Sequence, residues 1–283
     1  MLGVVLVWGF NFSIIKGALA EMAPLAFNGL RFLLASVTML ILTRAMGGDL
    51  RVPRGDWPRL VLIGLIGHTI YQILFIIGLN RTQAGHSSLM LGLTPVFVAL
   101  IGLALGIERV RAWVWASILL SFTGVVLITS GSSNGFHLGG PTWQGDLLTL
   151  AATLCWAGYT VLAQPLLSRY SPLKLTTLTM VLGTVPFLAI ATPTLVAQDW
   201  SQVTAHGWLG LLYSYSLAIV AAYIVWYTSV QRVGSARTAL FSNLTPVVAL
   251  IAAWLLRGET LAPLQLIGAA VVLVGISLAR RRS

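Results

Sequence analysis

The chain is 283 residues long, and 57% of its residues are hydrophobic. Only 8% are charged, against roughly 25% in an ordinary soluble domain, and this composition excludes a soluble globular protein. The net charge of +10 must therefore be explained together with a membrane, and the single cysteine, Cys155, excludes disulfides within the chain and metal sites built from several cysteines.

Apolar runs, separated by Gly, Pro, Ser and charged clusters, divide the chain into candidate membrane spans. Each is close to the length that a helix needs to cross roughly 30 Å of hydrocarbon. Helices are expected because an open strand would leave its backbone groups unpaired in lipid. The longest connections, about 44–59 and 131–144, are predicted to be loops, so no soluble domain is expected. The ten predicted spans cover residues 1–18, 24–43, 60–79, 86–106, 112–130, 145–167, 172–192, 207–229, 236–256 and 263–279.

The basic residues are distributed unequally between the two faces of this membrane. If the N-terminus is cytoplasmic, 13 of the 17 Lys and Arg residues fall on the cytoplasmic side. Lys16, Arg81 and Arg257 fall on the other side, and Arg31 lies within a span. The positive-inside rule therefore predicts that both termini are cytoplasmic. A nucleic-acid partner is not expected, because these residues are scattered over loops without interleaved aromatics.

One motif occurs twice. The sequence LTPV, followed by an apolar run and a glutamate thirteen positions after the proline, has its prolines at Pro95 and Pro246, 151 residues apart. Earlier in each half, an offset of 148 residues relates Trp8 to Trp156. The chain is therefore predicted to contain two copies of one five-helix unit.

Five is an odd number of spans, so the second copy must enter the membrane from the opposite face. We therefore predict an all-α integral membrane protein in which two inverted five-helix repeats surround a central cavity. The repeats are residues 1–131 and 145–283, joined by an extracytoplasmic loop of residues 132–144. Inverted repeats can exchange conformations and open one central site to alternate sides, so the motif is expected to serve a gate on each face.

The paired LTP motifs with their glutamates, the pair formed by Trp8 and Trp156, and the five-plus-five arrangement resemble the EamA-type members of the drug/metabolite transporter superfamily. The resemblance covers essentially the whole chain, and the general pattern is similar to the YddG-type amino-acid exporters of bacteria. It implies ten helices in the bacterial inner membrane, cytoplasmic termini and a cavity near mid-bilayer. It also implies export of amino acids, aromatic ones included.

Polar and aromatic side chains at membrane depth predict which helix faces line the cavity, because such groups usually face protein or water. Many recur three or four residues apart, on one face of a helix. The expected substrate-binding residues are Trp8, Asn11, His68, Tyr71, Gln72 and Ser88 in the first half, and Trp156, Tyr159, Tyr223, Trp226, Ser242 and Asn243 in the second.

Other readings of single residues remain open at this point. His68 could instead hydrogen-bond across a helix interface. Glu108 and Glu259, near helix ends, are expected to hold loops together and not to bind substrate. Pro95 and Pro246 leave the carbonyls four residues earlier without a helical partner, so we expect kinks that shape the cavity and act as gating points.

The placement of charge bears on the substrate. No acidic residue falls in the middle third of a span, which disfavours a lipophilic-cation exporter. Arg31 and Lys16 could reach the outer interface, which disfavours a paired-cation site for sugar phosphates. An uncharged, ring-lined pocket remains, suited to a small amphipathic zwitterion such as an aromatic or apolar amino acid. Downhill facilitated export is favoured, and proton-coupled antiport of another small organic substrate is the alternative, with His68 as the titrating group.

Two other classes of protein are disfavoured. An intramembrane enzyme is not expected, because the four histidines form no catalytic or metal-binding spacing. A channel is disfavoured because the polar stripe fades toward both ends of each helix. We expect no cofactor and no metal, and the expected partners are a small-molecule substrate and the lipid bilayer. The sequence leaves the exact substrate, the coupling ion and the oligomeric state open, and it is compatible with a monomer.

Overall fold

The computed structural model describes residues 1–82, 84–131, 142–257 and 261–281, and this part of the chain is helical without a strand. The all-α prediction is confirmed for these residues. The first half contains α1 (Leu2–Ala18), α2 (Pro24–Ala45), α3 (Trp57–Gly64), α4 (Tyr71–Arg81), α5 (Ala84–Leu91), α6 (Thr94–Ala104) and α7 (Ala112–Ser130). The second half contains α8 (Trp143–Ala163), α9 (Pro172–Ala197), α10 (Ala205–Tyr215), α11 (Ala222–Val233), α12 (Ser235–Leu240), α13 (Thr245–Arg257) and α14 (Pro263–Arg281).

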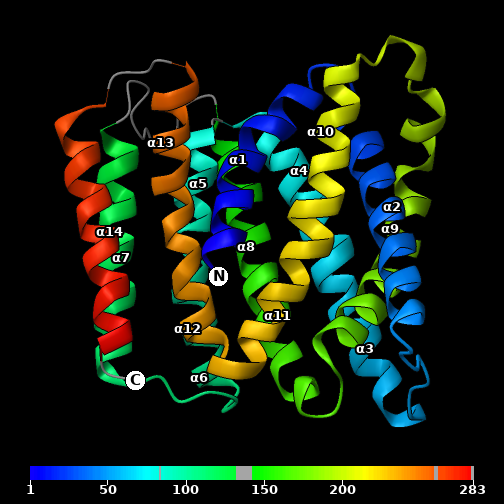
Figure 1. Cartoon of the computed structure of the whole chain (residues 1–283), viewed down its shortest axis with the longest axis horizontal. Coiled ribbons are helices and arrows are strands. Elements are labelled where there is room, and N and C mark those ends of the chain that lie inside the picture. The colour runs from blue at the N-terminus through cyan, green and yellow to red at the C-terminus, as the bar shows by residue number, and fades with distance from the viewer. Residues whose placement is uncertain (83, 132–141, 258–260, 282–283) are drawn as a thin grey trace.

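The helices stand side by side as a bundle (Figure 1). Seven helical stretches are long and apolar enough to cross a membrane, judged by length and composition. Three shorter apolar helices accompany them within the described residues, at Leu2–Ala18, Leu89–Ala104 and Pro263–Leu278. The seven longer stretches are Pro24–Ala45, Arg54–Arg81, Ala112–Ser130, Trp143–Ser168, Pro172–Ala197, Ala205–Val233 and Ser235–Ala252.

Irregular turns interrupt the helices at matched places in the two halves. The π-helical segment η2 (Leu65–Ile70) joins α3 to α4, and η5 (Ser216–Ala221), 151 residues later, joins α10 to α11. Such π segments often occur at functional sites. Helices α5 and α6 are separated just before Pro95, and a 3-10 turn, η6 (Phe241–Leu244), separates α12 from α13 just before Pro246. The repeated sequence therefore produces repeated breaks.

The two halves pack against each other throughout the bundle. Helix α7 lies along α14 and α2 lies along α9, at opposite ends of Figure 1. Helix α8 packs on α4 and α6, and α1 packs on α10 and α13. Small residues allow the closest approach: a Cβ added at Gly124 of α7 would lie 2.6 Å from the carbonyl oxygen of Gly268 on α14. Close contact at small residues is typical of helices that associate in lipid.

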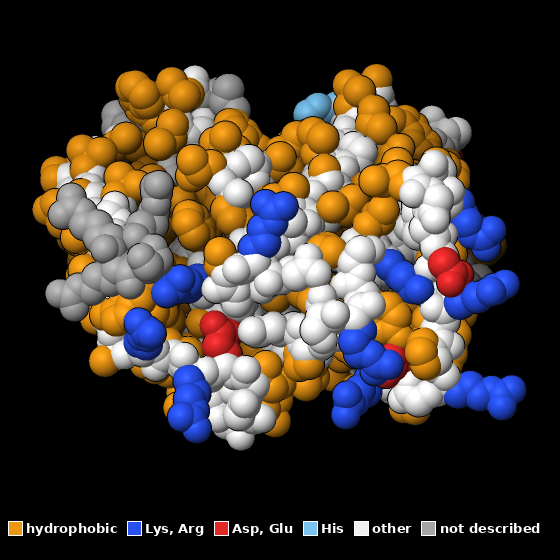
Figure 2. Space-filling model, turned by 60° about the horizontal axis from the view of Figure 1, so that its bottom comes forward, with side chains coloured by type: hydrophobic (Ala, Val, Ile, Leu, Met, Phe, Trp, Pro, Cys, Tyr) orange, Lys and Arg blue, Asp and Glu red, His pale blue; other side chains and the backbone are white. Residues whose placement is uncertain are grey.

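The outer surface has apolar sides and one basic end. Large apolar side chains such as Val185 and Val196 are 65% and 81% exposed on the side of the bundle. Figure 2 turns the lower end of Figure 1 toward the viewer and shows Lys and Arg side chains gathered over it. Apolar sides and a basic end are expected of a protein whose sides face lipid and whose ends face water.

Candidate functional site

A pocket lies in the middle of the bundle, between helices of both halves. It contains about 690 Å³ of space not filled by atoms, a volume that includes open solvent space. Six of its lining side chains are aromatic: Trp8, Phe12, Tyr71, Phe75, Trp156 and Tyr223. The others are Asn11, Arg31, Gln72, Thr94, Ser242 and Thr245, which are polar or charged, and Leu91, Gly92, Ala218 and Pro246.

The structure brings many of the predicted residues to this pocket and leaves others behind its wall. Trp8, Asn11, Tyr71, Gln72, Trp156, Tyr223, Ser242 and Pro246 line it. His68, Tyr159, Trp226 and Asn243 are buried but do not line it, and neither does Pro95. The side chain of Ser88 lies outside the described part of the structure.

Side chains at equivalent positions of the two repeats contact each other at the pocket. The rings of Trp8 and Trp156, 148 positions apart, meet edge to face with their centroids 5.9 Å apart. Gln72 Nε2 donates a hydrogen bond of 3.3 Å to the hydroxyl of Tyr223, 151 positions later. The pocket therefore lies where the two halves of the chain face each other.

Behind the lining, a second layer of side chains holds His68. Its Nε2 lies 3.0 Å from the Tyr159 hydroxyl and 3.3 Å from Thr179 Oγ1, and the imidazole is fully buried. Its Nδ1 has no partner in the described structure, and its ring lies 5.9 Å from that of Tyr223, which lines the pocket. His68 therefore hydrogen-bonds across a helix interface, and its ring lies beside that of Tyr223, which lines the pocket.

The aromatic residues continue on that side of the pocket as a closed cluster. Trp226 is fully buried, and its ring lies 5.1 Å from Trp8 and 5.6 Å from Trp156. Tyr159 and Tyr227, both fully buried, are 5.1 Å apart, measured between ring centroids. These buried rings therefore pack directly behind Trp8 and Trp156 of the pocket lining.

Polar groups at the helix breaks make local hydrogen bonds. Thr94 Oγ1 donates to the carbonyl of Leu91 at 2.7 Å, so the carbonyl that Pro95 leaves without a helical partner is satisfied by the threonine of the same motif. Thr245, the equivalent threonine, lines the pocket with a hydroxyl that has no partner in the described structure. Asn11 Oδ1 accepts a 2.8 Å hydrogen bond from Ser214.

Arg31 is the charged residue among the lining residues that the sequence interpretation missed; Phe12, Phe75, Thr94 and Thr245 are among the others. The prediction that Arg31 reaches the outer interface is wrong: the side chain is 4% exposed and lines the pocket. The prediction of an uncharged pocket is wrong for the same reason. The position of Arg31, seven residues past the start of α2, was readable from the sequence, but the direction of its side chain was not.

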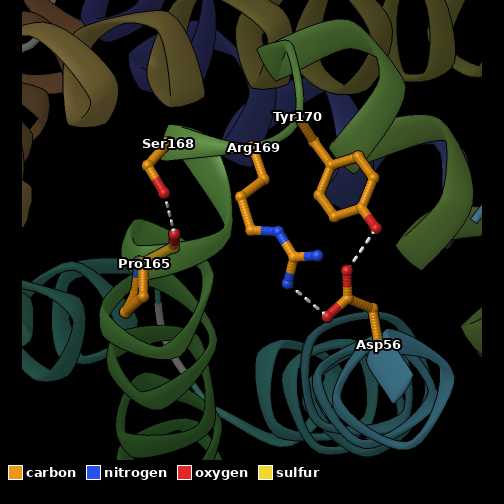
Figure 3. A network of polar contacts seen from close by, with 5 residues as sticks. All are labelled: Asp56, Pro165, Ser168, Arg169 and Tyr170. Carbon is orange, nitrogen blue, oxygen red and sulfur yellow. Dashed lines mark hydrogen bonds and ion pairs between the residues drawn. The ribbon is translucent and has the colours of Figure 1, made fainter. Parts of the chain in front are cut away.

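Polar contacts tie connecting segments together at the lower end of the bundle. Arg169 Nη1 donates to Asp56 Oδ1 at 2.7 Å, and the Tyr170 hydroxyl donates to Asp56 Oδ2 at 2.5 Å (Figure 3). Burial, followed by the hydrogen bond to Asp56, raises the pKa of Tyr170 to about 12. The contact joins the segment before α3 to the segment before α9, and hence the two halves.

Glu108 makes a second tie between the halves at this end. Its Oε2 accepts hydrogen bonds from the backbone N–H groups of Ser235 at 3.0 Å and Ala236 at 3.1 Å, and from the Ser235 hydroxyl at 2.6 Å. The carboxylate thereby satisfies the free N–H groups at the start of α12. Glu259, its equivalent, lies outside the described residues.

Comparison with known proteins places these features among membrane transporters. A model described as the EamA-like transporter family matches residues 1–130 and again 143–281. Probable amino-acid metabolite efflux pumps of Salmonella typhimurium and Escherichia coli are 31% and 30% identical to this chain, each over 96% of it and 91% of the relative. A solved crystal structure of a protein, 18% identical, has a TM-score of 0.82 over 100% of this chain and 97% of that one, which is a likeness of fold.

Proposed function

Because this chain belongs to the EamA-like transporter family, we propose that it is a ten-span transporter whose halves, residues 1–131 and 145–283, are inverted repeats. The packing of the helices supports this. The repeat offsets exchange the pair α4 and α8 with the pair α11 and α1, and both pairs are in contact. Helices α7 and α14, which are equivalent, pack against each other, as α2 and α9 do. A two-fold relation between the halves requires this pattern of contacts.

The distribution of charge supports an orientation in the bacterial inner membrane. The lower end of the bundle carries the gathered Lys and Arg side chains, and the C-terminus lies at that end (Figures 1 and 2). Since cytoplasmic loops carry the excess of basic residues, the lower end is the cytoplasmic one in our proposal. The N-terminal end of α1 and the C-terminal end of α14 are both directed toward it.

The proposed activity is export of small amphipathic metabolites, with aromatic and apolar amino acids as the favoured substrates. The observation that carries it is a pocket lined by six aromatic side chains, at the place where equivalent residues of the two halves contact each other. Aromatic faces suit a ring or an apolar side chain, and the neutral amides of Asn11 and Gln72 suit the polar end of an amino acid. Relatives 30% and 31% identical are described as probable amino-acid metabolite efflux pumps.

Alternating access is the proposed mechanism. The breaks before Pro95 and Pro246, and the π segments η2 and η5, provide hinges at equivalent places in the two halves. Exchange of conformation between the halves would open the pocket to one side while the other is closed. In this proposal, the buried aromatic cluster around Trp226 is what closes one end of the pocket in the conformation described here.

Counterflow in proteoliposomes tests this proposal. Vesicles loaded with unlabelled tryptophan, phenylalanine or methionine are expected to accumulate labelled substrate transiently and saturably, which a pore would not do. Trp8→Ala, which removes a pocket ring, is expected to weaken transport, whereas Trp208→Ala, at a residue 41% exposed and outside the pocket lining, is the matched control. Absence of counterflow for every amino acid with folded protein would refute the activity.

We favour facilitated diffusion, in which transport runs downhill without a coupling ion, and proton antiport is the alternative. His68 favours the alternative in one respect, since it is a buried imidazole with a free Nδ1 and touches Tyr223 in the pocket wall. His68→Gln separates the two readings. If uptake responds to an imposed pH gradient in the parent and not in His68→Gln, with transport retained, the uncoupled mechanism is wrong.

A further inference from the structure

We propose that Arg31 binds the carboxylate of the transported molecule, so that the pocket selects small monocarboxylates with an apolar body and excludes amines that lack a carboxylate. This inference rests on the proposed function, and it names the chemical group that the site requires. It arises from the one pocket residue whose charge the described structure leaves unbalanced.

Arg31 lies deep in the protein. It is seven residues past Pro24, the first residue of α2, which places it about 10 Å along the helix axis. Its side chain is 4% exposed and lines the pocket. Isolated buried charge is strongly unfavourable, so an arginine in this position needs either a fixed counter-charge or a ligand that brings one.

The described structure contains no fixed counter-charge for Arg31. Its Nη1 donates to the neutral amide oxygen of Asn28 at 3.2 Å, its Cζ lies 5.7 Å from the centre of the Phe32 ring, and its Nε has no partner. The acidic side chains that the structure describes all accept hydrogen bonds elsewhere: Glu21 from Thr204, Asp49 from Arg51, Asp56 from Arg169, Glu108 from Ser235, Asp146 from Thr82 and Asp199 from Ser201.

A chain of neutral side chains orients the guanidinium. Asn28 accepts from Arg31 and donates through Nδ2 to Gln72 Oε1 at 3.3 Å, and Gln72 in turn donates to the Tyr223 hydroxyl at 3.3 Å. None of these groups carries charge, and the chain occupies only one of the five N–H donors of the guanidinium. A planar guanidinium with free donors is suited to a carboxylate, which it can bind through two parallel hydrogen bonds.

The charge is present in one half of the pocket only. The position equivalent to Arg31, 148 residues later, is Thr179, whose hydroxyl is engaged with His68 and Tyr159. A substrate therefore meets a cation at α2 and aromatic rings at Trp8 and Trp156. We expect the carboxylate to point toward α2 and the apolar body toward these rings. Among the described residues that line the pocket none is acidic, so no carboxylate there holds an ammonium group, and an ammonium is tolerated and not required.

Three compounds that share a phenylethyl skeleton test the requirement: phenylalanine, 3-phenylpropionate, which lacks the ammonium, and 2-phenylethylamine, which lacks the carboxylate. Their binding to purified parent protein is measured by thermal shift, and their competition with labelled phenylalanine by counterflow. Phenylalanine and 3-phenylpropionate are expected to bind and compete, and 2-phenylethylamine is not. If 2-phenylethylamine binds as tightly as 3-phenylpropionate, the inference is overturned, and this comparison needs no variant.

Variants then assign the effect to Arg31. Arg31→Gln is expected to weaken binding of both carboxylates about 10- to 100-fold, the range for losing hydrogen bonds to a charged group. Arg31→Lys, which keeps the charge without the planar fork, is expected to lie between the two. Arg44→Gln, which removes an exposed charge from the same helix, is the matched control and is expected to change nothing. Unchanged carboxylate affinity in a folded Arg31→Gln variant would contradict the assignment.

The two proposals can fail separately. If phenylalanine shows counterflow and 2-phenylethylamine competes equally, transport stands and the role of Arg31 falls. If no compound shows counterflow while 3-phenylpropionate still stabilises the parent and not Arg31→Gln, the carboxylate site stands and the transport activity falls.

Discussion

Replacing Glu108 with alanine should loosen the lower end of the bundle. The carboxylate links the connection after α6 to the start of α12 through the backbone N–H groups of Ser235 and Ala236. In Glu108→Ala both N–H groups lose their acceptor, whereas the Ser235 hydroxyl keeps Gln164 as a partner.

The expected size follows from what is left unpaired. Loss of a helix cap costs about 0.5 to 2 kcal/mol, and a buried donor left without a partner costs about 1 to 3 kcal/mol. Ser235 is fully buried and Ala236 is 2% exposed, but Glu108 is only half-buried, so water can replace part of the lost interaction. We therefore expect Glu108→Ala to lower the free energy of unfolding by about 2 kcal/mol. Glu108→Gln, which keeps an acceptor oxygen but not the charge, should lose about half as much.

Reversible unfolding by SDS in mixed micelles, followed by circular dichroism, measures this difference. Asp49→Ala is the control, because Asp49 is exposed and, within the described structure, accepts only from the backbone N–H of Arg51, two residues later. It should stay within about 0.5 kcal/mol of the parent protein. A loss for Glu108→Ala no larger than that of the control would mean that the tie contributes nothing to stability, and the reasoning would be refuted.

Three further changes have defined outcomes in the same unfolding assay. Gly67→Ala would place a Cβ 2.5 Å from the Tyr159 ring and should cost about 1 to 3 kcal/mol; a neutral result would show that the ring moves freely. Gly124→Ala would meet the Gly268 carbonyl at 2.6 Å and should destabilise the pair α7 and α14, whereas Gly3→Ala, with nothing within 4 Å, should not; equal effects would contradict the packing argument. Because the pKa of Tyr170 is raised to about 12, its phenol stabilises the fold fully below pH 10, and that contribution is lost as the pH rises to 12. Tyr170→Phe should therefore lose less stability across that window than the parent, and an unchanged alkaline slope would count against the role of burial.

The helices were predictable because the physical signal lies within each segment. A run of apolar residues of the right length must be helical in lipid, whatever surrounds it. The repeat was also predictable, because the LTPV motif occurs twice, 151 residues apart. The same offset relates the π segments η2 and η5, which no local pattern indicates. Helical spacing also selected Trp8, Asn11, Tyr71 and the other predicted residues that line the pocket, because polar and aromatic groups at depth avoid lipid.

The predicted site residues that do not line the pocket share a physical explanation. Helical spacing tells which residues share a face, but not which neighbouring helix covers that face. His68 and Tyr71 share one face of a single stretch, yet Thr179 and Tyr159 cover the imidazole, while Tyr71 borders the pocket. Asn243 is likewise turned to Ser121 of α7.

The fold class, the two similar halves and the aromatic character of the pocket could thus be predicted from local composition and from the spacing of residues along the sequence. The reason is that the cost of exposing polar backbone to lipid acts on each segment separately. Arg31 shows the opposite dependence. Its distance from the helix end was compatible with a side chain at the interface, and only the packing of α2 against neighbouring helices turned it inward. The direction of a long side chain is set by the space and the partners around it, and these belong to other parts of the chain.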